Sequence, residues 1–392
     1  MSLGSARGTA LRSGLPDLVC LSHLRWNFVF QRPQHLMTRF ALERRVFFVE
    51  EPVESEGLPR LSLRRVSEGV TVATPHLPAG IPDPEAIQRD LLDALLAEHA
   101  VARPVLWYYT PMALGYSRHV AASTVVYDCM DELSAFANAP PALLDREREL
   151  FGRAHVVFTG GHTLYEAKRG HHRNVHPFPS SVDVAFFARA RNGLAEPADQ
   201  AALPRPRLGF FGVVDERMDR ELLAAVARSR PDWQLVVIGP VVKIPPSSLP
   251  HAPNLHWLGQ RPYEALPAYV GGWDVALMPF ALNEATRFIS PTKTPEYLAA
   301  GRPVVSTPIR DVVRPYGERS LVRIADGPEA FVHAIEGALS GERREWRAEV
   351  DALLATTSWD ATWRAMKRHV DDARTHPAHA RPAAHADAEV AR

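Results

Sequence analysis

The chain has 392 residues, a length that exceeds one ordinary hydrophobic core and therefore predicts two domains. Hydrophobic residues make up 46% of it and charged residues 23%, the proportions of a globular protein, which excludes wholesale disorder. Lysine plus arginine and aspartate plus glutamate both total 45, and the resulting formal net charge of zero disfavours broad electrostatic binding to nucleic acid.

The cysteine content and the hydropathy of the chain indicate the cellular compartment in which the protein is expected to reside. The only two cysteines, Cys20 and Cys129, sit in apolar, strand-like runs, so we expect no disulfide framework. No apolar run reaches the roughly 18 residues that a membrane-spanning helix needs. Residues 1–16 predict a flexible lead-in without the apolar centre of a signal peptide. The sequence favours a cytoplasmic protein and leaves room for peripheral association with the inner face of the membrane.

The first half of the chain alternates between two kinds of pattern. Short apolar runs bounded by polar, glycine or proline residues predict six buried strands, over 17–21, 46–49, 70–74, 105–109, 124–127 and 155–159. Helical patterns lie between several of them, at 33–43 and 91–99. Such alternation predicts parallel strands with right-handed crossovers, and hence a doubly wound α/β domain over residues 17–187.

The pattern is interrupted once and then restarts. Residues 188–207 are rich in alanine, proline, arginine and glycine and predict the linker between domains. A second doubly wound domain is predicted over residues 208–357, with strands at 208–214, 234–238, 255–258, 275–278, 303–307 and 321–324.

A helix is predicted over residues 358–375, with Ser358 as its N-cap. Its apolar stripe consists of Trp359, Trp363, Met366 and Val370. Residues 376–392 predict a disordered tail, whose histidines offer a metal site in principle but are more simply explained as solvated.

The residues after each strand are informative, because open parallel sheets bind ligands beyond the carboxyl ends of their strands. In the segment 290–307, Ser290 and Thr292 precede a short helix that carries Lys293 and Glu296 and stops at Ala-Ala-Gly. Free amides at a helix N-terminus attract anions. A lysine in a first helical turn opposes the helix dipole, which makes sense if a diphosphate binds beside it. The alternative is a plain surface Lys–Glu pair.

Two further strand ends in the second domain carry candidate donor residues. Gly212 permits close backbone approach to a ligand, and Arg217 follows in the same turn. The planar guanidinium of Arg217 suits a phosphate, although pairing with Asp215 or Asp219 is the alternative. Gly239 follows the next strand.

The first domain carries polar and aromatic groups after its first strand. The loop holds His23, Arg25, Trp26, Gln31 and Arg32, a mixture that suits a sugar-like ligand, and core packing is the alternative for Trp26.

Three more residues follow later strands of the first domain. Asp128 and Asp131 are candidates to hold an acceptor hydroxyl or to accept its proton, with helix capping as the alternative. His162, after Gly160 and Gly161, is a further candidate for the cleft wall.

Several absences narrow the function. The chain has no Gly-x-x-x-x-Gly-Lys-Ser/Thr phosphate loop, and no Gly-x-Gly-x-x-Gly follows its first strand, which disfavours a dinucleotide oxidoreductase. No zinc pattern occurs outside the tail, and no Asp-x-Asp occupies a plausible metal position. We therefore expect no metal site and no required cofactor.

The segment 290–307 closely resembles the donor-binding motif of the GT-B glycosyltransferases, in particular family 4-like enzymes of bacterial cell-surface polysaccharide synthesis. The run Trp26-x-Phe-x-x-Gln-Arg-Pro-Gln-His35 resembles a subgroup of the same enzymes. The resemblance spans about residues 17–370 and implies two nucleotide-binding-like domains facing across a cleft. It also implies that the last helix crosses back to the first domain.

The resemblance implies roles for individual residues. A nucleotide-diphosphate sugar binds the second domain, with Glu296 at the ribose and with Arg217, Lys293 and the amides near Ser290–Thr292 at the diphosphate. Gly212 and Gly239 let the nucleotide approach the backbone. Acceptor-binding residues come from the first domain: His23, Arg25, Trp26, Gln31, Arg32, His162 and the two candidate aspartates.

The implied activity is transfer of a sugar, of the hexosyl type, to a cell-surface glycan, lipid-linked or small-molecule acceptor, with retention of configuration. The chain departs from the family pattern at Phe288, where an acidic residue is usual, at Val213, where an arginine is usual, and at Met130, where a histidine is usual. A sugar-nucleotide epimerase or hydrolase, a non-catalytic scaffold subunit and a nucleotide-binding regulator of the same fold remain alternatives.

Overall fold

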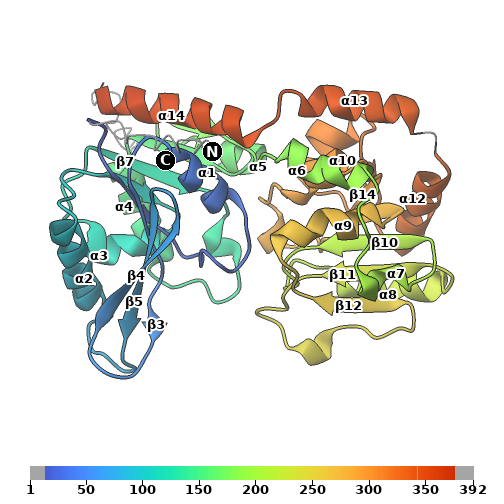
Figure 1. The fold of residues 1–392 in the computed structure, drawn as a ribbon, viewed down its shortest axis with the longest axis horizontal. Helices are drawn as coiled ribbons and strands as arrows, with labels where there is room; N and C mark the ends of the chain where they lie inside the picture. Colours follow the sequence, from blue (N-terminus) through green and yellow to red (C-terminus); the bar gives the residue numbers. More distant parts are fainter. Residues whose placement is uncertain (1–13, 342, 376–392) are drawn as a thin grey trace, which may run out of the picture.

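The computed structural model describes residues 14–341 and 343–375, and in this range the apolar runs form two separate sheets (Figure 1). The first sheet has nine strands, and all its pairs are parallel except that between β4 and β5. In spatial order its strands are β3 (Val53–Glu54), β5 (Val70–Leu77), β2 (Val46–Val49), β1 (Leu18–Leu21), β6 (Val105–Tyr108), β7 (Thr124–Cys129), β8 (Val156–Thr159) and β9 (Val175–Pro177), with β4 (Arg60–Ser67) beside β5.

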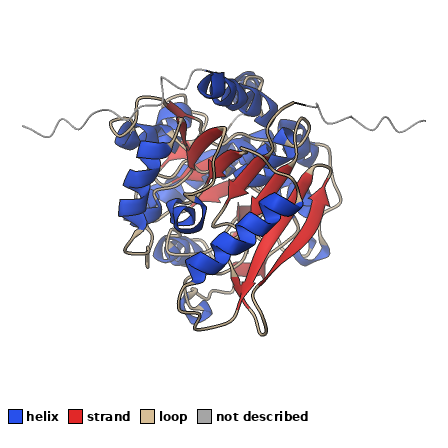
Figure 2. Cartoon of the chain, turned by 90° about the vertical axis from the view of Figure 1, so that its left-hand side faces the viewer, coloured by secondary structure: helices blue, strands red, loops and turns tan. Residues whose placement is uncertain are grey.

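Helices cover both faces of this sheet, as the alternating pattern requires (Figure 2). One face packs against α1 (Arg32–Phe40) and α14 (Trp359–Thr375). The other face packs against α2 (Pro84–Glu98), α3 (Leu114–Ser117), α4 (Leu143–Arg153) and α5 (His162–Lys168). The first domain is therefore doubly wound, as predicted.

The second sheet has six parallel strands. In spatial order they are β12 (Leu255–Gly259), β11 (Gln234–Ile238), β10 (Arg207–Phe211), β13 (Val275–Met278), β14 (Val304–Ser306) and β15 (Arg323–Ile324). The helices of this part of the chain are α6 (Val184–Ala188), α7 (Ala198–Ala201), α8 (Arg220–Ser229), α9 (Leu266–Gly271), α10 (Lys293–Ala299), α11 (Arg310–Val312), α12 (Pro328–Ser340) and α13 (Arg344–Leu354). One continuous hydrophobic core joins all of them except α7 to the sheet.

The last helix returns to the first domain, as predicted. In Figure 1, α14 runs from the end of the second domain along the outside of the first domain, beside α1. Trp359, Met366 and Val370 are buried in the same core cluster as strands β1 and β2. The predicted N-cap is confirmed, because the Ser358 hydroxyl accepts a hydrogen bond from the Ala361 amide at 3.1 Å.

The predicted linker is packed against a domain rather than being a flexible connection between the two. Residues 188–207 contain α7 and pack against the second domain. There the side-chain amide of Gln200 donates a hydrogen bond to the backbone carbonyl of Tyr269 at 2.9 Å. The Trp273 indole in turn donates to the Gln200 side chain at 2.8 Å. This segment therefore belongs structurally to the second domain.

Three further features differ from the sequence expectations. Strands β3, β4 and β9 were not expected, and β5 continues to Leu77. The run 321–324 is paired only at Arg323 and Ile324. The predicted tail and lead-in lie largely outside the described residues. No helix in the described part of the chain is long and apolar enough to cross a membrane.

Candidate active site between the two domains

A cavity of about 510 Å³ lies between the two domains. Its first-domain wall is formed by the loop after β1 and the turn after β7. Its second-domain wall is formed by the ends of β10, β11 and β12 and by the start of α10. Parallel sheets bind ligands beyond the carboxyl ends of their strands, and here both sheets point those ends at one cavity. This cavity is the candidate active site.

Helix α10 presents the two residues that the sequence singled out most strongly. Lys293 and Glu296 are three positions apart, so they share one face of the helix, and both line the cavity. Tyr297 fixes the helix against the sheet, because its buried hydroxyl accepts a hydrogen bond from the Phe211 amide at the end of β10 at 2.9 Å. The predicted Ser290 and Thr292 line the cavity just before the helix.

The Lys293 ammonium is enclosed but has no ion-pair or hydrogen-bond partner within residues 14–341 and 343–375. Its nearest described groups include the Phe210 ring, 5.5 Å from Nζ to the centroid. Burial, followed by the charge of Arg217, lowers the pKa of Lys293 from 10.5 to about 8. The side chain is therefore a cation at neutral pH that lacks a counterion, and it is placed to meet an anionic ligand.

Glycines make room for this lysine. A Cβ on Gly212 would lie 2.1 Å from Cε of Lys293, and Gly212 has a φ of +140°. Gly239 has a φ of +150°, and its Cβ would lie 1.8 Å from the Gly212 carbonyl oxygen. The floor of the cavity at β10 and β11 is therefore bare backbone, as a site for a closely approaching ligand needs.

Glu296 is the second enclosed group without a partner. It is 8% exposed, and its Oε2 atom is buried with no hydrogen-bond partner among the described residues. Burial raises the pKa of Glu296 from 4.5 to about 8, against an opposing effect of Lys293. A buried carboxyl group left unpaired is costly, so this arrangement is expected where a ligand hydroxyl completes the hydrogen bonding.

Arg217 lines the cavity but is already paired. Its Nε and Nη2 atoms donate to the buried Asp215 carboxylate at 3.0 Å and 2.7 Å. From the sequence, Arg217 could either bind a phosphate or pair with Asp215, and in the structure it pairs with Asp215. Nη1 has no hydrogen-bond partner among the described residues, so the fork can still donate to a ligand. Asp215 offsets the net charge that Arg217 brings.

The two candidate aspartates lie in different environments. Asp128 is fully buried and forms an ion pair with Arg32, from Nη2 to Oδ1 at 2.8 Å. Arg32 is itself 1% exposed and also donates to the Phe178 carbonyl at 2.6 Å. This ion pair joins β7 to α1 inside the first domain. The expectations that Asp128 acts on an acceptor and that Arg32 binds one are therefore corrected, because neither side chain lies in the cavity.

Asp131, by contrast, lines the cavity, and its carboxylate has no partner within the described ranges. Burial raises its pKa, while Arg217 lowers it. The turn that carries Asp131 packs closely against Gly160, since a Cβ on Gly160 would lie 2.2 Å from the Met130 carbonyl oxygen. Asp131 is therefore the first-domain carboxylate available to a ligand hydroxyl.

The loop after β1 contains the other predicted acceptor residues. Trp26 and Gln31 line the cavity. Arg25 instead holds the loop in place, donating to the Pro52 carbonyl at 2.9 Å and pairing with Glu50 at 3.3 Å. His23 is not part of the cavity lining, and burial lowers its pKa to about 4, so it is neutral.

His162 is at the domain interface rather than in the cavity. Its backbone amide and that of Thr163 donate to the carboxylate of Asp311, in the second domain, at 2.8 Å and 3.0 Å. Glu166 of the first domain also pairs with Arg310 at 2.7 Å. Asp311 was not predicted, because nothing in its local pattern indicates a partner in the other domain.

Phe288, which stands where the resemblance implies an acidic residue, packs against the core cluster of the first domain. It is not part of the cavity lining. The departure from the family pattern thus adds an apolar contact between domains. Gln260 and Tyr263, which line the cavity after β12, were not predicted either.

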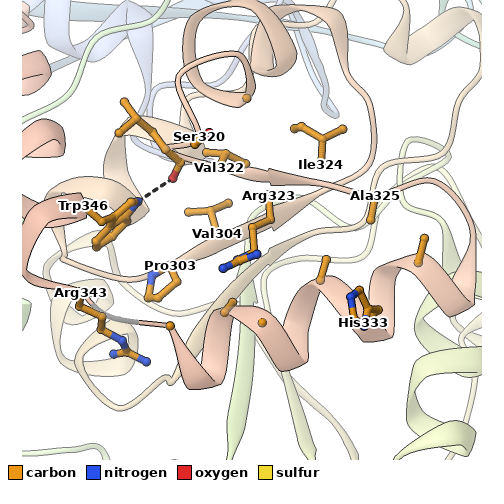
Figure 3. A pocket seen from close by; sticks show the side chains of 17 residues that line it. Pro303, Val304, Ser320, Val322, Arg323, Ile324, Ala325, His333, Arg343 and Trp346 are labelled. Carbon is orange, nitrogen blue, oxygen red and sulfur yellow. Dashed lines mark hydrogen bonds between the residues drawn. The ribbon is translucent and has the colours of Figure 1, made fainter.

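A second cavity, of about 600 Å³, lies at the edge of the second sheet between β15, α12 and α13 (Figure 3). Trp346 on its wall donates to the Leu321 carbonyl at 2.9 Å. No carboxylate lines it, and its polar side chains are those of Ser320, Arg323, His333, Arg343 and Trp346. Across the described ranges no group of three or more His, Cys, Asp or Glu side chains could hold a metal ion. The chemically equipped cavity is therefore the one between the domains.

Comparisons with known proteins agree with this geometry. Residues 205–341 match the family described as Glycosyl transferases group 1, and this range includes Gly212, Arg217, Lys293 and Glu296. TuaH of Bacillus subtilis (strain 168), named as a glycosyltransferase of teichuronic acid biosynthesis, is 25% identical over 303 residues, covering 71% of this chain and 75% of TuaH.

Solved structures share the whole architecture. A UDP-forming α,α-trehalose-phosphate synthase from Burkholderia xenovorans has a TM-score of 0.68 at 11% identity, covering 92% of this chain and 99% of that one. Sucrose-phosphate synthase from Thermosynechococcus elongatus has a TM-score of 0.66 at 15% identity, covering 90% and 98%. This chain is therefore a glycosyltransferase of the GT-B fold, and residues 205–341 of its second domain match the glycosyl transferases group 1 family model.

Proposed function

We propose that a nucleotide-diphosphate sugar binds between the domains, with its ribose at Glu296 and its diphosphate at Lys293 and Arg217. One observation carries the proposal. Lys293 and Glu296 lie on one helical face at the cavity, and each is enclosed without a partner among the described residues. A diphosphate supplies the missing anion, and ribose hydroxyls supply the missing hydrogen bonds.

The chemistry follows from where charge develops. As the bond between the sugar and the diphosphate breaks, negative charge grows on the leaving phosphate oxygen. Lys293 and the free Nη1 of Arg217 would stabilise that charge, and their enclosure strengthens the interaction. We propose that these side chains and the neighbouring backbone amides neutralise the leaving group, so that no metal cofactor is required.

We further propose that the acceptor enters from the first-domain side, where Asp131 accepts a hydrogen bond from its attacking hydroxyl. Asp131 has the required features, because it is unpaired at the cavity wall and burial raises its pKa. Retention of configuration at the transferred, hexosyl-type sugar is the outcome that the family resemblance implies. Determining the anomer of the product by NMR tests it.

The acceptor is proposed to be an intermediate of a cell-surface glycan, lipid-linked or free. The name of TuaH supports this assignment, since that relative is named for teichuronic acid biosynthesis. A cytoplasmic enzyme working at the inner face of the membrane would meet both such an acceptor and its soluble donor. Fractionation of cells expressing the tagged chain, followed by a salt wash of the membranes, tests this placement.

A thermal-shift screen tests the donor site directly. The purified chain is mixed with UDP, GDP, ADP and their sugars, with UDP first because it is the product named for the B. xenovorans neighbour. We expect one nucleotide to raise the melting temperature, and Lys293→Ala and Glu296→Ala each to abolish that shift. Lys367→Ala is the matched control, because this lysine pairs with Asp371 at 2.7 Å on α14. A shift that persists in both site variants would refute the proposed donor site.

A further inference from the structure

We propose that the loop between β1 and α1 covers the nucleoside of the donor, so that the first domain helps to select the base. This inference rests on the proposed function. It changes the role predicted for Trp26 and Gln31 from acceptor binding to donor binding.

The loop is attached to the donor domain rather than standing apart from it. The Gln260 side-chain amide, just after β12, donates to the Phe28 carbonyl at 2.7 Å. The Phe30 ring lies 4.9 Å from the ring of Tyr263, which in turn stacks on Phe186 at 4.6 Å. Backbone and side chains of the loop therefore contact the part of the second domain next to Glu296.

The loop is also held rigidly in the first domain. The side-chain amide of Gln34 donates hydrogen bonds to the backbone carbonyls of Trp26 and Val29 at 2.7 Å and 3.0 Å. The Trp26 ring packs edge-on against Phe48, with 5.1 Å between centroids, and its backbone amide donates to Glu50 at 2.8 Å. A loop pinned in this way forms a preformed wall, and a preformed wall reduces the entropy cost of binding.

The contacts of the loop favour the nucleoside over the acceptor. Phe28 and Phe30 contact the second domain at Gln260 and Tyr263, just after β12. Asp131 lies on another part of the first-domain wall, after β7, which is separated from β1 by β6 in the sheet. A ribose at Glu296 can therefore extend its base toward the loop.

The side chains presented there suit a flat heterocycle. Phe28 lines the cavity, and Phe30 is 39% exposed despite being aromatic. Asn27 is exposed at the same wall and offers an amide that can both donate and accept. Aromatic faces stack on any base, whereas an amide distinguishes bases by their hydrogen-bonding edges.

The test measures donor binding without any acceptor, so that an acceptor-binding role of the loop cannot contribute. Calorimetric titrations compare the nucleoside diphosphate selected from UDP, GDP and ADP with inorganic pyrophosphate. Phe28→Ala is expected to weaken nucleoside diphosphate binding about tenfold, the scale of one lost stacking contact. Pyrophosphate binding should stay unchanged. Phe28→Leu should give an intermediate loss, and Leu42→Ala, at an exposed position on the same domain, should give none.

The outcomes separate this inference from the donor site itself. If Lys293→Ala abolishes binding of both ligands while Phe28→Ala and Asn27→Ala affect neither, the donor site stands and the loop does not cover the nucleoside. Equal weakening of both ligands by Phe28→Ala would also overturn the inference, because the loop would then act on domain closure alone. Failure of the unmodified chain to bind any nucleotide would overturn the proposed function and this inference together.

Discussion

The carboxylate of Asp311 accepts a hydrogen bond from the backbone amide of Thr163 at 3.0 Å, across the boundary between the two domains. It thereby caps the first turn of α5, a role that a residue of the same chain segment usually performs. Gly161 lies in the same contact, because a Cβ there would come within 2.1 Å of Asp311 Oδ2. The second domain thus completes a helix of the first, and the contact depends on how the domains are arranged.

Replacing Asp311 by alanine should loosen this interface. The loss of an N-cap costs on the order of 1 kcal/mol. Hydrogen exchange followed by mass spectrometry should show faster exchange at the amides of His162 and Thr163 and in the facing loop at Ser290. The control is Asp219→Ala, since Asp219 caps α8 within the second domain by accepting from Leu222 at 2.8 Å. It should speed exchange only around α8, and unchanged exchange at Thr163 in Asp311→Ala would contradict the cross-domain cap.

The two neighbouring aspartates should respond oppositely to substitution. Asp128→Ala leaves Arg32 buried without its counterion, so the free energy of unfolding should fall by about 3–5 kcal/mol. Asp131→Ala removes an unpaired carboxylate at the cavity and should change stability by no more than about 0.5 kcal/mol. Chemical denaturation followed by circular dichroism compares them. Equal destabilisation would mean that Asp131 also has a structural role.

Binding of a nucleoside diphosphate should weaken as the pH rises above about 8. Burial lowers the pKa of Lys293 to about 8, so the free chain loses this positive charge at a pH where an exposed lysine keeps it. Lys293→Arg should remove the decline, because a guanidinium stays charged across this range. Titration calorimetry between about pH 7 and 9.5, above the second ionisation of the phosphate, measures the effect. A parallel decline in Lys293→Arg would assign it to another group.

Glu296 should make the folded chain less stable as the pH rises from mildly acidic to mildly basic. Its carboxyl group has a pKa of 4.5 when unfolded, and burial raises this pKa to about 8 in the fold. Between these values the folded state binds more protons, so the free energy of unfolding falls with rising pH, by at most about 1.4 kcal/mol per pH unit.

Glu296→Gln should flatten this dependence, because the amide does not titrate. Melting temperatures measured at intervals from about pH 5 to 8 test it. Glu329→Gln, at an exposed position of α12, should leave the slope unchanged. A slope that survives in Glu296→Gln would show that Glu296 is already ionised in the fold.

Most of the architecture could be predicted because buried parallel strands leave a strong apolar signal. Strand β4 left none, since it lies at the edge of the first sheet and exposes Arg60, Arg64 and Arg65. Such charges protect an edge from pairing with other chains, and they also hide the strand from a search for apolar runs. The antiparallel pairing of β4 with β5 was therefore missed.

The site was predictable where one local element determines the geometry. Lys293 and Glu296 share a short helix, so their spacing alone brings them together. Asp128 was misplaced because β7 continues to Cys129, two residues beyond the predicted strand end at 127. Asp128 thus belongs to the sheet and faces the core, whereas Asp131 lies past its end. Contacts such as Asp311 with Thr163, or Gln260 with Phe28, depend on the docking of the domains, which no local pattern encodes.

The return of α14 has a consequence for how the chain is made. The core that contains β1 and β2 also contains Met366 and Val370, which follow them by more than 300 residues. During synthesis the first domain leaves the ribosome with one face of its sheet covered by α1 but not yet by α14. Helix α14 can pack on that face only after the whole second domain has been translated. A chaperone that shields exposed apolar surface is thus expected to engage the nascent chain until residues 359–373 emerge, a period that ribosome profiling of chaperone-bound chains would reveal.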